Sequence, residues 1–221
     1  IIMNTAARQA IAKCLATASQ PATAPPVHPS SKSIKSSAKL SHADIAAHMA
    51  RLTVPPTMTA SRSALPAFQH RELLLTTVRS HQVTIVNGAT GCGKSTQLPR
   101  LLVDDAVEQR ANACNIIVAQ PRRLAATALA ERVSAELGDS VGGLCGYRIR
   151  GDAKLGASTA LTYMTTGVLL RTLESDPLLT CASHIIVDEV HERSIETDLL
   201  LLVLRRALRA GASAKIILMS A

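Results

Sequence analysis

A glycine-rich segment carries the clearest chemical signal in the sequence. It reads Gly88-Ala89-Thr90-Gly91-Cys92-Gly93-Lys94-Ser95-Thr96 and fits the pattern G-x-x-x-x-G-K-[ST], which is typical of loops that bind nucleoside triphosphates. Glycines let backbone N–H groups approach phosphate oxygens, and a helix beginning at Lys94 would point its positive dipole end at the same anions. We expect Lys94 to reach the β- and γ-phosphates and the Ser95 hydroxyl to bind Mg²⁺.

A pair of carboxylates at the end of an apolar stretch is the second signal. Residues 184–187 are His-Ile-Ile-Val, and Asp188 and Glu189 follow them directly. Ligands of open α/β sheets gather at the carboxyl ends of the strands, so acids placed there would lie opposite the phosphate loop. We expect Asp188 to hold the Mg²⁺ shell through water. Glu189 is expected to orient and deprotonate the attacking water.

Strands must alternate with helices to bring the loop and the acids to one edge. Apolar strands are expected at 83–86, 115–119, 144–149, 160–163, 184–187 and 215–219. Helices are expected at 69–79, from residue 94, at 124–137, at 168–173 and at 197–209. The strands are apolar throughout rather than alternating, which is typical of a parallel sheet covered on both faces. The predicted fold class is therefore α/β, a P-loop parallel sheet sandwiched by helices.

The first 64 residues differ from the rest in composition. They are rich in Ala, Ser, Thr and Pro, and Asp44 is their first acid. We predict a low-complexity, mostly disordered tail over 1–64, with a short helix at 44–52 ended by Pro55-Pro56. An organelle transit peptide is the alternative interpretation of this tail. A globular domain is expected over 65–221.

Bulk properties limit the class of protein further. The formal net charge is +8, but residues 65–221 hold 17 basic and 15 acidic residues, so charge alone does not predict nucleic-acid binding there. The five cysteines include no C-x-x-C pair, which favours reduced thiols in an intracellular protein over disulfides or zinc. The longest apolar runs are too short to span a membrane. A cytoplasmic location is expected, with nuclear or organellar locations left open.

The residues around the two acids resemble a known family. Asp188-Glu189-Val190-His191-Glu192-Arg193 is similar to the motif of the DEAH/DExH-box RNA helicases of superfamily 2, with Val where the box has Ala. The segment 144–150 resembles the RNA-helicase-A-like and translation-associated branches. The resemblance runs from about Leu65 to Ala221. It implies a RecA-like ATP-binding lobe of an ATP-dependent RNA helicase, with ATP and Mg²⁺ as cofactors and RNA as a partner.

The resemblance also implies roles for residues outside the loop and the acids. Gln120-Pro121-Arg122-Arg123 matches a motif that grips the RNA backbone, and paired arginines after a strand suit phosphate binding. Thr165-Thr166-Gly167 matches a second backbone-contacting motif, and Arg150 lies in a segment near the RNA path. Arg132 matches an arginine that stacks on adenine. His191 matches a residue that couples the ATP site to the motif beginning at Ser220-Ala221.

Three departures from the family pattern matter, and the last of them leaves an alternative function open. Ala89 stands where the family mostly has an acid, and the sequence stops inside the Ser220-Ala221 motif, before the second RecA-like lobe that supplies arginine fingers. In other P-loop enzymes, loss of the arginine finger lowers the rate of hydrolysis by a factor on the order of 10³–10⁵. A catalytically silent nucleotide- or RNA-binding fragment is therefore the alternative function. A small-molecule kinase would have no use for the RNA-contacting motifs.

Overall fold

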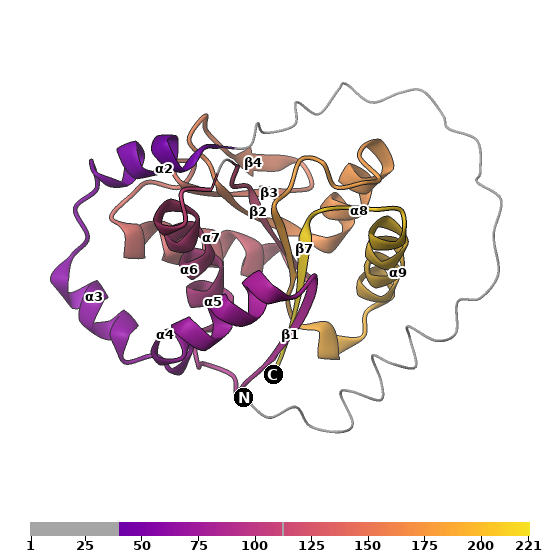
Figure 1. The fold of residues 1–221 in the computed structure, drawn as a ribbon, viewed down its shortest axis with the longest axis horizontal. Helices are drawn as coiled ribbons and strands as arrows, with labels where there is room; N and C mark the ends of the chain where they lie inside the picture. Colours follow the sequence, from indigo (N-terminus) through magenta and orange to yellow (C-terminus); the bar gives the residue numbers. More distant parts are fainter. Residues whose placement is uncertain (1–39, 112) are drawn as a thin grey trace.

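The computed structural model describes residues 40–111 and 113–221, and a seven-stranded sheet forms their centre (Figure 1). The strands are β1 Val83–Asn87, β2 Ile116–Gln120, β3 Cys145–Ile149, β4 Asp152–Lys154, β5 Leu161–Thr165, β6 His184–Val187 and β7 Lys215–Ser220. Their order across the sheet is β1-β7-β6-β2-β5-β3-β4. All neighbouring pairs are parallel except β3 and β4, which form an antiparallel edge. The predicted α/β fold is confirmed.

Helices cover both faces of the sheet (Figure 1). They are α2 His42–Met49, α3 Pro56–Ser63, α4 Pro66–Gln69, α5 Arg71–Ser80, α6 Lys94–Glu108, α7 Arg123–Leu137, α8 Thr166–Ser175 and α9 Ile195–Arg209, with a 3₁₀ turn η1 at Val190–Glu192. One core cluster packs α2, α5, α6 and α7 against the sheet, and a second packs α8 and α9 against the opposite face. No helix in the described part of the chain has the length and apolar character needed to cross a membrane.

Strand β2 explains why the sequence pattern is apolar without alternation. Ile116 and Val118 belong to the first core cluster, whereas Ile117 and Ala119 belong to the second. Successive side chains of a strand point to opposite faces, so a strand with two covered faces needs an apolar residue at every position.

The helix expected at 69–79 corresponds to α5, but its buried face was only partly predicted. We expected Leu73, Leu74 and Val78 to share that face. Leu73 is 54% exposed, while Leu74, Leu75 and Val78 are buried. The packing of α5 on α6 and β1 decides which of its side chains face the core, and the sequence pattern alone does not give that packing.

Residues 40–64 are more structured than expected. The predicted short helix at 44–52 corresponds to α2, which begins with a capping box between Ser41 and Asp44. Ile45 on α2 is fully buried in the core, and Leu40 pairs with Cys114 in an isolated β-bridge. The expectation of disorder therefore does not hold for residues 40–64, while residues 1–39 lie outside the described residues.

The cysteines of the described segments form no disulfide. Cys92, Cys114, Cys145 and Cys181 are all thiols, in agreement with the reduced cysteines that the sequence predicts. Burial raises the pKa of both the Cys114 and Cys145 thiols to about 12. These two cysteines therefore act as small core residues.

Candidate functional site

The predicted site residues gather at one edge of the sheet. The glycine-rich loop follows the carboxyl end of β1, Arg122 and Arg123 follow β2, and Thr165 ends β5. Asp188 and Glu189 follow β6 directly. Because these strands are parallel, their carboxyl ends meet at the same edge, as expected for a ligand site in an open α/β sheet. Arg132 is the exception, since it lies within α7.

The glycine-rich loop has a backbone that suits anion binding. Gly91 has φ +80° and Gly93 has φ +91°, values in the left-handed region that glycine adopts without strain. A Cβ at Gly93 would come within 3.1 Å of both Leu65 and Gln97. Gly93 is also the residue before the first turn of α6, so the free N–H groups of that turn face the loop.

Lys94 is mostly buried and turns back onto its own loop. Its Nζ donates to the carbonyl oxygen of Gly88 and to that of Ala89 at 3.0 Å. The Cys92 Sγ lies 3.7 Å from the same nitrogen. An ammonium is thus held inside the loop, next to the positive end of a helix, where an anion would be stabilised by both.

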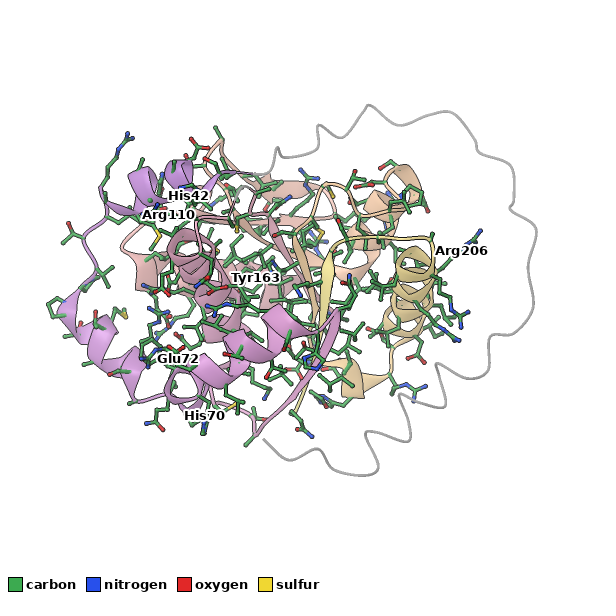
Figure 2. The ribbon with its side chains drawn as sticks, viewed as in Figure 1. His42, His70, Glu72, Arg110, Tyr163 and Arg206 are labelled. Atoms are coloured by element: carbon green, nitrogen blue, oxygen red, sulfur yellow. The ribbon has the colours of Figure 1, made fainter. Side chains whose placement is uncertain are left out.

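Tyr163 anchors the phosphate-binding helix and was not singled out from the sequence. This fully buried residue on β5 lies at the centre of the molecule (Figure 2). Its hydroxyl donates to the Ser95 carbonyl oxygen at 2.7 Å, and burial raises its pKa well above the usual value. The bond leaves the Ser95 hydroxyl uninvolved. An aromatic residue in a mostly aliphatic core was the signal available for this position.

Asp188 is a buried carboxylate with both oxygens held. Its Oδ2 accepts from Gln120 Nε2 at 2.6 Å, and its Oδ1 accepts from the Glu189 N–H at 2.9 Å. Asp188 is only 2% exposed to solvent. Each oxygen keeps a second lone pair, so the carboxylate can still accept a metal-bound water.

Glu189 stands in a strained turn beside His191. Its φ of +53° lies in the left-handed region, which is uncommon for residues other than glycine. His191 Nδ1 lies 3.5 Å from Glu189 Oε2 and accepts from the Ala221 N–H at 3.3 Å. His191 therefore contacts both Glu189 and the Ser220-Ala221 segment, while the coupling role that the resemblance implies stays a prediction.

The expected RNA-contacting residues divide into exposed and buried groups. Arg122 is exposed and pairs with Glu192 at 2.9 Å, and Arg123 donates to the Arg150 carbonyl oxygen at 3.2 Å. Thr166, in contrast, is 2% exposed and its hydroxyl bonds the Gln120 carbonyl oxygen at 3.3 Å. The Thr166 hydroxyl is thus occupied within the fold, whereas the arginines remain accessible.

Arg132 lies on α7 and makes a close ion pair. Its Nε is 2.7 Å from Glu136 Oε1, and its side chain is 52% exposed. Glu136 is buried and also accepts from Gln97 on α6. Sequence reasoning missed Glu136, whose position four residues after Arg132 is the one available signal.

The residues present fit a magnesium ion bound together with a nucleotide. Within residues 40–111 and 113–221, no group of three or more His, Cys, Asp or Glu is arranged to hold a metal. Mg²⁺ commonly takes only one or two protein ligands and completes its shell with water and phosphate oxygens. The buried Asp188 carboxylate and the Ser95 hydroxyl are oxygen donors of the type that it prefers.

A phosphate loop between a strand and a helix, at the same sheet edge as two acids that follow another parallel strand, defines a P-loop nucleotide-binding domain. The comparisons with known proteins refine this class. The DEAD/DEAH box helicase model matches residues 68–221. The chain therefore belongs to the DEAD/DEAH box helicase family, and its sheet and loop are those of a P-loop lobe in the DExH branch.

Individual relatives support the same assignment. The chain is 49% identical over 167 residues to the ATP-dependent RNA helicase DHX29 of Homo sapiens, covering 72% of this chain and 12% of the relative. It is 47% identical over 165 residues to the DExH-box ATP-dependent RNA helicase DExH1 of Arabidopsis thaliana, covering 74% of this chain and 17% of the relative. The chain thus spans a small part of these relatives.

Proposed function

We propose that this chain is the ATP-binding lobe of an RNA helicase and that, joined to a second RecA-like lobe, it hydrolyses Mg-ATP to remodel RNA. The observation that carries the proposal is the placement of Lys94, Asp188 and Glu189 at the same edge of the sheet. A phosphate-binding cation and two acids with different surroundings are what phosphoryl transfer to water requires.

The residues divide the work between binding and chemistry. The loop N–H groups and Lys94 bind the phosphates, displacing the loop carbonyls that hold the ammonium. Bound Mg²⁺ would neutralise charge on the phosphates, with the Ser95 hydroxyl as its protein ligand and Asp188 holding its shell through water. Glu189 is more exposed than Asp188 and follows it in the turn, so it is the acid free to orient water. Arg122 and Arg123 bind the RNA backbone.

A nucleotide- or RNA-binding chain without turnover is the second candidate function. We assign no residue within 40–111 and 113–221 as an arginine finger for the γ-phosphate, and such a residue commonly contributes about 10³–10⁵ in rate. The chain also covers only 12–17% of the relatives compared above. Binding can therefore be complete in this chain while hydrolysis depends on residues outside it.

Steady-state ATP hydrolysis, with and without single-stranded RNA, tests these functions. Glu189→Gln is the matched control, because it removes the base while keeping the size of the side chain. RNA-stimulated turnover that the control lacks would establish an active enzyme. An absence of turnover, with Mg-ATP still raising the melting temperature, would favour the binding function. Turnover that survives Glu189→Gln would contradict the role of Glu189.

A further inference from the structure

A buried polar network joins the phosphate-binding helix α6 to Arg132 on α7. Glu136 accepts from Arg132 Nε at 2.7 Å through Oε1 and from Gln97 Nε2 at 2.9 Å through Oε2. Gln97 is fully buried, and its Oε1 accepts from Arg62 Nε at 2.7 Å. Three consecutive hydrogen bonds therefore connect Arg62 to Arg132.

Each bond of the network has one workable direction. A guanidinium group only donates and an ionised carboxylate only accepts, whereas the amide of Gln97 does both. Arg62 therefore fixes the oxygen end of the Gln97 amide, and Glu136 fixes its NH₂ end. The second N–H of that NH₂ reaches the Thr96 hydroxyl at 3.0 Å. The two oxygens of Glu136 are shared between Gln97 and Arg132, one each.

The network begins next to the phosphate loop. The Gln97 N–H donates to the Gly93 carbonyl oxygen at 2.7 Å, and its Cγ lies 3.1 Å from the position of a Cβ built on Gly93. Gln97 is thus packed against the turn that precedes Lys94. Any shift of the loop relative to α7 would strain the bonds between Gln97 and Glu136.

The network ends on a half-exposed arginine. The Arg132 side chain is 52% exposed, while Glu136 is 3% exposed. A long surface side chain loses rotamer freedom when it binds a flat ligand, and a bond formed beforehand lowers that entropic cost. The ion pair with a buried carboxylate therefore restricts the Arg132 guanidinium before any ligand binds.

We propose that Glu136 is a positioning residue that holds Arg132 ready for the nucleobase, and that Gln97 and Arg62 fix it relative to the phosphate loop. The proposal rests on the proposed function and on the adenine-stacking role that the resemblance implies for Arg132. Arg62 is placed by its own ion pair with Asp104 at 2.8 Å. It lies on α3, before the family-matched residues 68–221, so this earlier segment also contributes to the nucleotide site.

Binding of Mg-ATP compared with binding of magnesium tripolyphosphate tests the proposal. Tripolyphosphate occupies the phosphate loop but has no base, so the ratio of the two Kd values isolates the base contact. Arg132→Ala and Glu136→Gln should each lower the preference for ATP about threefold to fivefold, as expected for loss of one cation–π contact. The affinity for tripolyphosphate should change less than about twofold in both variants, since neither residue lies in the phosphate loop and tripolyphosphate has no base to stack.

A double exchange provides the matched control. Glu136→Gln alone sets the new NH₂ group against that of Gln97, which breaks the chain of bonds. Combining it with Gln97→Glu restores a donor and an acceptor to every bond, because the new carboxylate accepts from both neighbours. The double variant should recover the ATP preference. If Glu136→Gln does not fold, Arg62→Ala tests the network from its other end, with a smaller loss of ATP preference expected.

Several results would overturn the proposal. Equal weakening of ATP and tripolyphosphate by Glu136→Gln would show a purely structural role for Glu136. An unchanged ATP preference in Arg132→Ala would remove the contact that Glu136 is proposed to position. Lys94→Ala tests the proposed function separately, because it should remove binding of both ligands. If Lys94→Ala bound both normally, the phosphate site itself would be wrong.

Discussion

Two lysines at opposite edges of the sheet make the same bonds with different consequences. Lys94 Nζ donates to two main-chain carbonyls, those of Gly88 and Ala89, and Lys215 Nζ donates to those of Arg79 and His81. Lys215 lies at the end of α5, where the partial charge of the helix is negative. Lys94 lies at the start of α6, where that charge is positive. Lys215 is therefore satisfied by its carbonyl partners, and Lys94 is ready for an anion.

The same contrast extends to the other polar groups of the two edges. The amino edge of the sheet is the one formed by the amino ends of its parallel strands. There, Gln82 donates to the carbonyls of Ala212 and Ala214, and Asp176 accepts from the N–H groups of Thr180 and Cys181. These bonds close loops and leave nothing for a ligand to replace. At the carboxyl edge, acids and arginines border a glycine turn. Residue type alone thus does not separate function from structure, whereas position relative to helix ends does.

Replacing Lys94 should mainly weaken nucleotide binding, whereas replacing Lys215 should mainly lower the stability of the fold. Lys94→Ala is expected to weaken Mg-ATP binding by at least about 100-fold, because charged hydrogen bonds to phosphate contribute roughly 1.5–3 kcal/mol each. Lys215→Ala should leave that affinity unchanged and lower the free energy of unfolding by about 1 kcal/mol, through lost contacts at the helix end. Isothermal titration and urea unfolding of both variants measure the two effects. Similar nucleotide affinities in the two variants would contradict the contrast.

The amino edge should also make stability sensitive to pH. Burial, reinforced by Lys215, lowers the pKa of His184 from 6.5 to about 4, although Asp105 acts in the opposite direction. The unfolded state therefore binds more protons between these values, so stability should fall as pH drops from 6.5 toward 4. The full loss is at most roughly 3 kcal/mol. Urea unfolding at pH 7.5, 6 and 5 should show a shallower dependence in His184→Gln, and an unchanged slope would count against this origin.

Charge removal at the two edges should affect RNA binding differently. Replacing Arg122 and Arg123 with Ala is expected to weaken single-stranded RNA binding about tenfold and to reduce the salt slope by roughly 1.4, since two phosphate contacts are lost. Arg206 and Arg209 lie in the last turn of α9, toward the amino edge, and Arg206 points outward in Figure 2. Replacing them removes the same charge. Fluorescence anisotropy across salt concentrations that gave equal losses for both pairs would indicate only a bulk charge effect.

Much of the fold and the carboxyl edge followed from local sequence. Apolar runs predicted six parallel strands within about two residues, because both faces of this sheet are covered. The glycine loop and the acids after β6 were placed by the rule that ligands bind at the carboxyl ends of parallel strands. These features depend on residues close together in the chain.

Features that depend on distant partners could not be predicted in this way. The inward turn of the Thr166 hydroxyl toward Gln120 and the bond from Tyr163 to Ser95 join separate strands and helices. The anchoring of α3 through Arg62 and Gln97 spans 35 positions in sequence. No local period or motif encodes such contacts, since each depends on how two elements pack.

Loss of the hydrogen bond between Tyr163 and Ser95 should have the smallest effect of these changes. It should lower both the stability of the fold and the affinity for nucleotide. Tyr163→Phe removes the donor to the Ser95 carbonyl oxygen and should lower the free energy of unfolding by about 1 kcal/mol. Because that carbonyl belongs to the first turn of α6, Mg-ATP affinity should also fall, by about twofold. Tyr147→Phe is the matched control, since its hydroxyl bonds Asp152 on the β3–β4 edge at 2.8 Å. If both variants lowered ATP affinity equally, or neither did, Tyr163 would not support the phosphate loop through Ser95.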